Sequence, residues 1–285
     1  MGRCSVCRRS TVGQWRVRGG CYTQVMYSVA AAYRYRLIRS LRHAAAAALE
    51  LIWPTRCAGC ECLGTLLCES CADVLPFIDQ NLACPRCGAP VGLLVCTECT
   101  PIYEPQSFAF SQARCVLEFS ELTKRLIVAY KDGGERRLAS VLAHLLVHAI
   151  PADWHRWADA LTWVPADARA FRRRGFDHMA LLAPALAERI GLPAVSLLVK
   201  EARADQRSLG REQRAGNTSE IFSVKKPQRD VCEADVPSPL HLRNLILIDD
   251  VFTTGATLDA ATRVLLCSRG LKTREIRAAT VGRVW

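Results

Sequence analysis

The stretch LILIDDVFTTGAT, residues 245–257, decides the fold of this chain. It opens with four consecutive apolar residues, a pattern typical of a central parallel strand that is covered on both faces. The small residues of 253–257 predict a turn, and apolar positions from Leu258 to Leu265 predict a helix after it. Because a turn that enters a helix exposes backbone N–H groups, we expect a phosphate cradle here, with Gly255 allowing close backbone approach.

Two carboxylates, Asp249 and Asp250, stand between the strand and the turn. They would repel a phosphate, so they indicate another ligand group, such as sugar hydroxyls or a magnesium ion. An ordinary buried strand and loop is the alternative reading. It is disfavoured because two unpaired acids at the end of a buried strand are costly without a ligand.

The same stretch resembles, position for position, the 5-phosphoribosyl-1-pyrophosphate (PRPP) motif of type I phosphoribosyltransferases. The resemblance implies that Asp249 and Asp250 bind the ribose hydroxyls and that magnesium accompanies PRPP. It also implies a loop that binds the 5'-phosphate, which consists here of Thr253, Thr254, Gly255, Ala256 and Thr257.

Trp163-Val164-Pro165 and the later run RRRGFDH, residues 172–178, resemble the strand and the Arg-Arg-Gly-Phe-Asn-Gln segment of the ComF (competence protein F) family. This second resemblance covers roughly residues 55–285. Asp177 and His178 depart from the usual Asn and Gln, which puts the contacts of those side chains in question. The family's segment before the PRPP strand is matched at Arg203, Gln206, Leu209, Arg211, Arg214, Asn217 and Phe222.

Basic residues near this site are candidates for the pyrophosphate side of PRPP. The segment 200–219 is polar and rich in Arg, a composition typical of a loop that is either solvated or closes over a ligand. The candidates are Arg172, Arg173, Arg174, Lys200 and Arg203. Lys131 and Asp132, before Gly133-Gly134, are interpreted as capping the end of a helix.

Cysteine spacing predicts a metal-binding module at residues 55–100. Of 15 cysteines, eight form four Cys-x-x-Cys pairs, a spacing that favours two structural Cys4 zinc sites, or a double zinc ribbon, over disulfides. Adjacent pairing is preferred because its loops are short, although interleaved pairs, or Cys62 in place of Cys60, stay open. The expected ligands are Cys57, Cys60, Cys68, Cys71, Cys84, Cys87, Cys96 and Cys99. We expect the module to bury an interior separate from that of the following domain.

Charge is concentrated at the N-terminus. The chain has 285 residues, 50% of them hydrophobic, and a net charge of +11, of which nine Arg and one Glu in residues 1–50 supply +8. Residues 1–54 are therefore expected to be a basic arm, which is either disordered or begins before a translation start at Met26. Any attraction to a polyanion such as single-stranded DNA would act through this arm or through a local basic patch. No uncharged run is long enough to span a membrane, and a cytoplasmic protein is expected.

The rest of the chain, residues 101–285, alternates predicted strands and helices. Strands are expected at 113–119, 160–164, 194–199, 245–248 and 275–281, and helices at 122–130, 138–150, 179–190 and from 258 towards Gly270. This order predicts an α/β fold: a type I phosphoribosyltransferase-like parallel sheet with helices on both faces and the ligand at the carboxyl ends of the strands.

Two functions are compatible with these features. The first is phosphoribosyl transfer from PRPP to an unknown acceptor. The resemblance supplies no catalytic base, because Thr253 occupies the position where 6-oxopurine enzymes carry an Asp, and no cysteine-nucleophile domain for glutamine use is seen before the core. The second is a non-catalytic competence or DNA-uptake factor that senses PRPP or a nucleotide and binds single-stranded DNA or a protein partner.

Overall fold

The computed structural model describes residues 50, 54–90, 95–100, 108–200, 222–225 and 242–285. The chain divides into two compact units, Met1–Thr55 and Arg56–Trp285. The predicted basic arm falls almost entirely outside the described residues, and so does most of the predicted loop 200–219. Within the described residues, no helix combines the length and the apolar character needed to cross a membrane.

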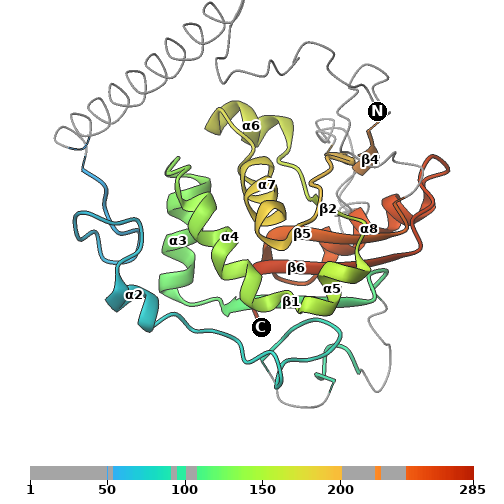
Figure 1. Ribbon diagram of the computed structural model, residues 1–285, viewed down its shortest axis with the longest axis horizontal. Helices are drawn as coiled ribbons and strands as arrows, with labels where there is room; N and C mark the ends of the chain where they lie inside the picture. The colour runs from blue at the N-terminus through green and yellow to red at the C-terminus, as the bar shows by residue number, and fades with distance from the viewer. Residues whose placement is uncertain (1–49, 51–53, 91–94, 101–107, 201–221, 226–241) are drawn as a thin grey trace, which may run out of the picture. The chain divides into compact units, whose positions relative to one another are not determined.

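A parallel sheet forms the centre of the second unit (Figure 1). Its strands are β1 (Gln112–Glu118), β2 (Ala160–Trp163), β5 (Asn244–Phe252) and β6 (Glu275–Arg283), in the spatial order β1-β6-β5-β2. Every neighbouring pair is parallel. The α/β class and the central position of the strand in 245–257 are therefore confirmed.

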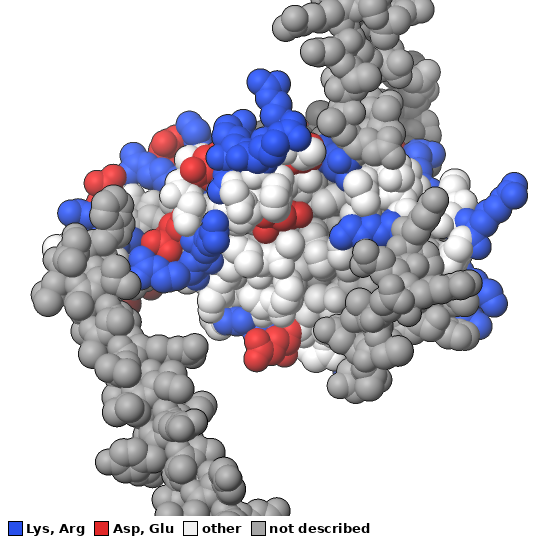
Figure 2. Space-filling view, turned by 90° about the horizontal axis from the view of Figure 1, so that it is seen from above, with Lys and Arg blue, Asp and Glu red and all other residues white. Residues whose placement is uncertain are grey.

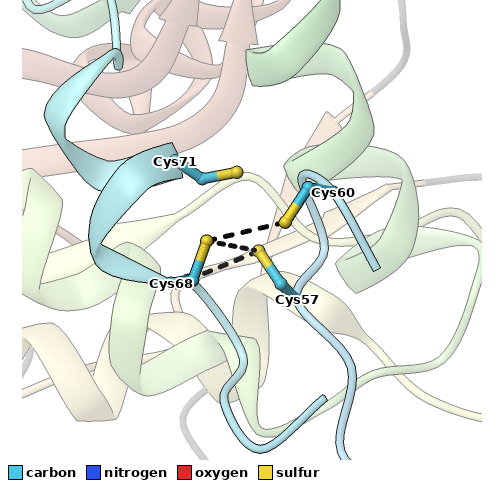
Figure 3. Close-up of side chains that lie close together, drawn as sticks. All are labelled: Cys57, Cys60, Cys68 and Cys71. Carbon is cyan, nitrogen blue, oxygen red and sulfur yellow. Dashed lines mark hydrogen bonds between the residues drawn. The ribbon is translucent and has the colours of Figure 1, made fainter. Parts of the chain in front are cut away.

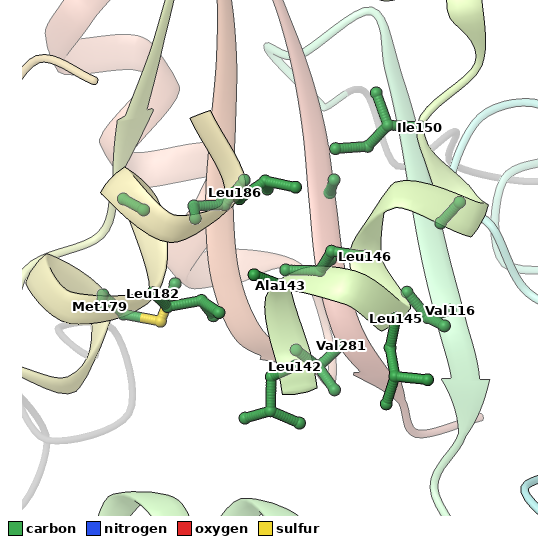
Figure 4. Packing of buried hydrophobic residues seen from close by; sticks show 14 of the residues in the cluster. Val116, Leu142, Ala143, Leu145, Leu146, Ile150, Met179, Leu182, Leu186 and Val281 are labelled. Carbon is green, nitrogen blue, oxygen red and sulfur yellow. The ribbon is translucent and has the colours of Figure 1, made fainter. Parts of the chain in front are cut away.

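One face of the sheet is covered by three helices. These are α3 (Glu121–Lys131), α4 (Leu138–Ala149) and α7 (His178–Ile190). Figure 4 shows side chains of α4 and α7, such as Leu146 and Leu182, packed among residues of the sheet such as Val281. Because β5 is buried on both sides, Ile246 and Ile248 join this cluster while Leu245 and Leu247, which alternate with them, face the opposite way.

The opposite face is covered by α8 (Ala256–Cys267) and by the second group of cysteines. Leu245 and Leu247 of β5 share a buried cluster with Leu258 of α8 and with Cys84 and Cys87. The second group of cysteines therefore shares its buried cluster with the sheet, and the prediction of a separate interior for the cysteine module is wrong. The reason is geometric: the backbone N–H of Ala113 in β1 donates to the carbonyl of Arg86 at 2.8 Å, which fixes the cysteine loop against the sheet.

The expected strand at 194–199 is only partly correct. Ala194 makes a single parallel bridge with Leu161 at the sheet edge. The chain then pairs as β3 (Leu198–Lys200) with β4 (Phe222–Val224) in a separate antiparallel two-stranded sheet. The polar composition of 200–219 gave no indication of the partner strand, so the prediction placed the segment with the main sheet.

Three short helices were not predicted. They are α2 (Glu69–Asp73), α5 (Ala152–Trp157) and α6 (Ala168–Arg174). Each has at most seven residues, too few for a clear apolar periodicity. The last is capped at its N-terminus by Asp167, whose side chain accepts a hydrogen bond from the N–H of Ala170 at 2.7 Å.

Candidate functional site

A polar cavity of about 300 Å³ lies where β2 and β5 end and α8 begins. This is the carboxyl edge of the parallel sheet, where crevices in α/β folds bind ligands. Its charged lining residues are Lys131, Asp167, Arg174, Lys200, Asp249 and Asp250. Three acids and three bases in one small cavity suit a ligand with both hydroxyl and anionic groups. Figure 2 shows the same interspersion of Lys and Arg with Asp and Glu on the face seen from above.

The predicted phosphate loop, Thr253–Thr257, follows β5 and includes the first residues of α8, so the predicted order of strand, turn and helix is confirmed. Thr253, Thr254 and Ala256 are exposed, so the loop is accessible to a ligand. Gly255 is the N-cap of α8 with φ 78°, and a Cβ there would stand 2.7 Å from the Phe252 ring. Only glycine fits this position without strain or a clash.

Replacing Gly255 by Ala should lower both thermal stability and affinity for a phosphorylated ligand. The added Cβ meets two aromatic rings, Phe252 at 2.7 Å and Phe108 at 2.8 Å. Gly134→Ala is the matched control, because Gly134 has φ 74° with nothing within 4 Å of its ideal Cβ. The backbone strain of about 1–2 kcal/mol is common to both variants, and overpacking adds roughly 1–3 kcal/mol only at Gly255. Equal melting temperatures for the two variants would contradict the crowding.

Asp250 is held ionised by two neighbours. Lys131 Nζ forms an ion pair with Asp250 Oδ2, and His178 Nε2 lies 3.1 Å from the same oxygen. Burial opposes ionisation, but the hydrogen bond with His178 and the charge of Lys131 outweigh it, so the pKa of Asp250 lies below its usual range. A carboxylate can only accept, so the imidazole carries a proton on Nε2.

Asp249 behaves in the opposite way. Both acids are only 8% exposed, and Asp249 Oδ1 accepts the backbone N–H of Asp250 at 2.8 Å. Burial, followed by the charge of Asp250, raises the pKa of Asp249 well above its usual value. Burial thus favours the protonated form of Asp249, which can donate, beside an Asp250 whose neighbours favour the carboxylate, which accepts.

Two residues of this cluster were missed or left open by sequence reasoning. Lys131 was interpreted as a helix cap, yet it pairs with an acid 119 positions later. His178, noted only as a departure from the ComF pattern, is 4% exposed and contacts Asp250. Tyr130, next to Lys131, donates a hydrogen bond to the carbonyl of His178, which joins α3 to α7. A lone Lys at a helix end carries no sequence signal for such a contact.

Asp177 has a structural role. Its Oδ1 accepts the N–H of Met179 at 2.9 Å and that of Ala180 at 3.3 Å, which caps α7. Its Oδ2 accepts the N–H of Ala166 at 3.2 Å. The acid therefore fixes the start of α7 against the end of β2, where a capping Asn would serve in the same way.

The candidate pyrophosphate residues do not all reach the cavity. Arg174 and Lys200 line it. Arg174 is held by Asp132, its Nε 2.9 Å from Oδ1, while Arg173 contacts the same oxygen at 3.4 Å. Arg172 is exposed and does not line the cavity. Arg203 lies outside the described residues.

The eight cysteines form two separate clusters, grouped by adjacent pairs. Their members are Cys57, Cys60, Cys68 and Cys71 in the first cluster and Cys84, Cys87, Cys96 and Cys99 in the second. Within each, the sulfurs lie within 4.8 Å of one another. Figure 3 shows the four side chains of the first cluster converging. Cys62 is exposed and does not belong to either cluster.

This geometry fits a tetrahedral zinc ion. Zn–S bonds of about 2.3 Å place thiolate sulfurs about 3.8 Å apart in a tetrahedron. The Cys57 and Cys68 sulfurs are 3.7 Å apart, and those of Cys87 and Cys96 are 3.5 Å apart. Burial disfavours the Cys57 thiolate, but backbone N–H groups directed at its sulfur outweigh burial and lower its pKa to about 6. The donor set is therefore compatible with zinc and complete without a substrate.

The sheet and the paired cysteine clusters define a parallel α/β protein with two Cys4 clusters that precede the sheet in the sequence. Its sequence is similar to those of the competence protein ComFC and the DNA utilization protein YhgH. ComFC of Bacillus subtilis (strain 168) is 26% identical over 208 residues, which cover 70% of this chain and 78% of that protein. YhgH of Escherichia coli (strain K12) is 27% identical over 207 residues, 70% of this chain and 84% of that protein. No family model matches the chain.

Solved structures are more distant. Orotate phosphoribosyltransferase from Aeropyrum pernix aligns with a TM-score of 0.29 at 19% identity, covering 55% of this chain and 61% of that one. A hypothetical protein from Neisseria gonorrhoeae with bound ppGpp aligns with a TM-score of 0.27 at 17% identity, covering 52% and 66%. The chain spans less than two thirds of either structure, and similarity of this extent assigns no ligand.

Proposed function

We propose that this protein binds PRPP, or a closely related phosphoribosyl compound, in the cavity between β2, β5 and α8. The observation that carries the proposal is the junction of β5 and α8. Two buried acids, Asp249 and Asp250, stand directly before an exposed, glycine-containing loop at a helix N-terminus. The loop suits a phosphate and the acids suit hydroxyls, and a ribose 5-phosphate carries both groups.

The acids would orient the ribose. Both contacts that the described residues make to the Asp250 carboxylate fall on Oδ2, which leaves Oδ1 for a hydroxyl. Asp249 can donate to a second hydroxyl while it is protonated. A magnesium ion brought in with PRPP would favour the ionised form of Asp249, because a nearby cation lowers the pKa of a carboxyl group.

The bases would face the pyrophosphate. Lys131, Arg174 and Lys200 line the same cavity as the acids. Each could neutralise part of the charge on a leaving pyrophosphate, which is the main electrostatic requirement for breaking the C1–O bond of PRPP. Lys131 pairs with one of the two site acids, so ligand binding can exchange its partner Asp250 for a phosphate oxygen.

The reaction that such a site would catalyse is phosphoribosyl transfer from PRPP to an acceptor. An acceptor nucleophile would form a bond to C1 of PRPP while pyrophosphate leaves with the electrons of the C1–O bond. Holding the phosphate, the ribose and the pyrophosphate in fixed geometry would supply most of the acceleration. The position three residues after Asp250 holds no candidate base, because it is occupied by Thr253, which is exposed.

The experiment that separates binding from catalysis is a titration of Mg-PRPP by calorimetry, followed by a pyrophosphate-release assay with a panel of bases and amines. We expect saturable binding at one site. Release that depends on one acceptor class would establish transfer. Binding without release would support a sensor, and failure to bind PRPP would contradict the proposed function.

A competence or DNA-uptake factor is the second candidate, favoured by the sequence similarity to ComFC, a competence protein, and to YhgH, a DNA utilization protein. Here the site would sense PRPP or a nucleotide, and single-stranded DNA or a competence protein would be the partner. The charge of residues 1–50 would supply the attraction to DNA.

Deleting residues 1–25 therefore tests the DNA role. The deletion removes five Arg, so affinity for a single-stranded oligonucleotide should fall by at least about tenfold at low salt, with a shallower salt dependence. PRPP affinity should stay the same. Unchanged DNA affinity would place the contact on another part of the chain, and no measurable DNA binding by the full chain would remove this candidate.

A further inference from the structure

Arg283, the last residue of β6, contacts the phosphate loop with a buried guanidinium group. Its side chain is 1% exposed. Arg283 pairs with Phe252 across the parallel strands β6 and β5, and its guanidinium carbon stands 4.4 Å from the centre of that ring. Its Nη1 donates to the carbonyl of Thr253 at 2.8 Å. The first peptide of the phosphate loop is thus fixed by an arginine from the neighbouring strand.

The other nitrogen of the same guanidinium reaches the second cysteine cluster. Nη2 donates to Glu98 Oε2 at 2.7 Å and contacts Cys87 Sγ at 3.8 Å. Glu98 stands between Cys96 and Cys99, inside the second Cys-x-x-Cys pair of that cluster. The planar guanidinium of Arg283, whose donor directions are fixed, therefore links Glu98 and Cys87 at the second cluster to the carbonyl of Thr253 in the phosphate loop.

We propose that Arg283 is a positioning residue that couples metal binding at the second cysteine cluster to anion binding at the phosphate loop. The coupling rests on the proposed function, because the anion is the phosphate of PRPP. An ion in the cluster holds Cys87 and the loop that carries Glu98, and these hold the guanidinium in the orientation that meets Thr253. Without the ion, the partners of Nη2 are less ordered, so the guanidinium is held less firmly and its hydrogen bond to the carbonyl of Thr253 is weakened.

The coupling predicts reciprocal effects on two ligands. If the ion raises affinity for PRPP, then PRPP must raise affinity for the ion by the same factor. Because one hydrogen bond orders the loop, we expect a factor of about three to ten. A residue that only stabilised the fold would change both affinities without changing their mutual dependence, so the coupling factor is the diagnostic quantity.

The test uses the full-length zinc-loaded protein. Zinc affinity is measured by competition with a chromophoric chelator, with and without saturating Mg-PRPP. In the unmodified protein, PRPP should tighten one of two ions by about three- to tenfold. In Glu98→Gln and in Arg283→Lys the factor should fall towards one. Glu98 is 55% exposed, so its variant should fold even if the buried arginine does not tolerate replacement.

Glu69→Gln is the matched control, since Glu69 stands between Cys68 and Cys71 of the first cluster and is also exposed. It should keep the full coupling factor. A protein that binds PRPP with the same zinc affinity in its presence and absence would overturn the proposal, as would an unchanged factor in both Glu98→Gln and Arg283→Lys.

If the unmodified protein does not bind PRPP, the proposed function fails, and hydrogen exchange then decides the coupling by itself. Amides of residues 254–257 should exchange faster after zinc removal in the unmodified protein. In Glu98→Gln they should already exchange faster with zinc bound. Exchange at these amides that does not respond to zinc would exclude the coupling independently of any ligand.

Discussion

Replacing both strand-end acids, Asp249→Asn with Asp250→Asn, should weaken binding of Mg-PRPP by about a hundredfold. Each acid is expected to make charge-assisted hydrogen bonds to a ribose hydroxyl, worth roughly 1.5–3 kcal/mol, or about ten- to a hundredfold in affinity. The two effects will not add fully, because the residues are adjacent and share partners. Calorimetric titration of both proteins measures the difference directly.

Asp153→Asn provides the control. Asp153 lies in the first turn of α5 and contacts Arg277 near the start of β6, at the opposite end of the sheet from the cavity. Its loss removes one negative charge from the protein without touching the site, so PRPP affinity should remain within about twofold. Equal affinities of the double variant and the unmodified protein would contradict the assignment of the ribose site.

The two acids should differ in their effects on stability. Asp249 is destabilised by burial and by its neighbour, so Asp249→Asn should leave the melting temperature of the ligand-free protein unchanged or higher. Asp250 has a lowered pKa, so its charge stabilises the folded state above the ordinary Asp pKa of about 4, and that contribution is lost as the pH falls below it. Asp250→Asn should therefore lower stability at pH 7 and reduce the dependence on acid pH. Thermal unfolding of the single variants between pH 3 and pH 7 is the measurement.

The contrast between the acids also shows where sequence reasoning succeeds. The apolar run before Asp249 and the small residues after Asp250 are local patterns with a direct physical meaning, so they predicted the strand, the loop and the helix together. Lys131 and His178 reach Asp250 from 119 and 72 positions away. Their contacts depend on how α3 and α7 pack on the sheet, and no local pattern contains that information.

The cysteine module illustrates the same limit. Spacing predicted which sulfurs gather, because a Cys-x-x-Cys pair is a local device. It could not predict that Cys84 and Cys87 would share a buried cluster with Leu247. That contact depends on the pairing of Ala113 with Arg86, which brings the cysteine loop to the sheet.

Loss of zinc from the second cluster should therefore destabilise the whole second unit. Cys87 is 1% exposed in a cluster that includes sheet residues such as Leu247 and Ala278. Structural zinc contributes about 10–16 kcal/mol in small metal-binding peptides, compared with a total stability of about 5–15 kcal/mol for a typical domain. Even a partial loss of about 5 kcal/mol should lower the melting temperature by roughly 10–20 °C. Cys87→Ser should show this fall in scanning calorimetry, with zinc content reduced from about two ions to about one.

The first cluster should behave differently, because Cys60 is exposed and its neighbour Gly59 lies at the surface of α3, where Arg125 donates to the carbonyl of Gly59 at 3.1 Å. Cys60→Ser should also lose about one ion but leave the main transition within a few degrees, and Cys267→Ser, which changes an exposed cysteine outside both clusters, should alter neither property. If Cys87→Ser instead produces a small separate transition and the main midpoint stays unchanged, the module and the sheet have independent interiors. A metal-free protein with full stability would show that the clusters hold thiols rather than zinc.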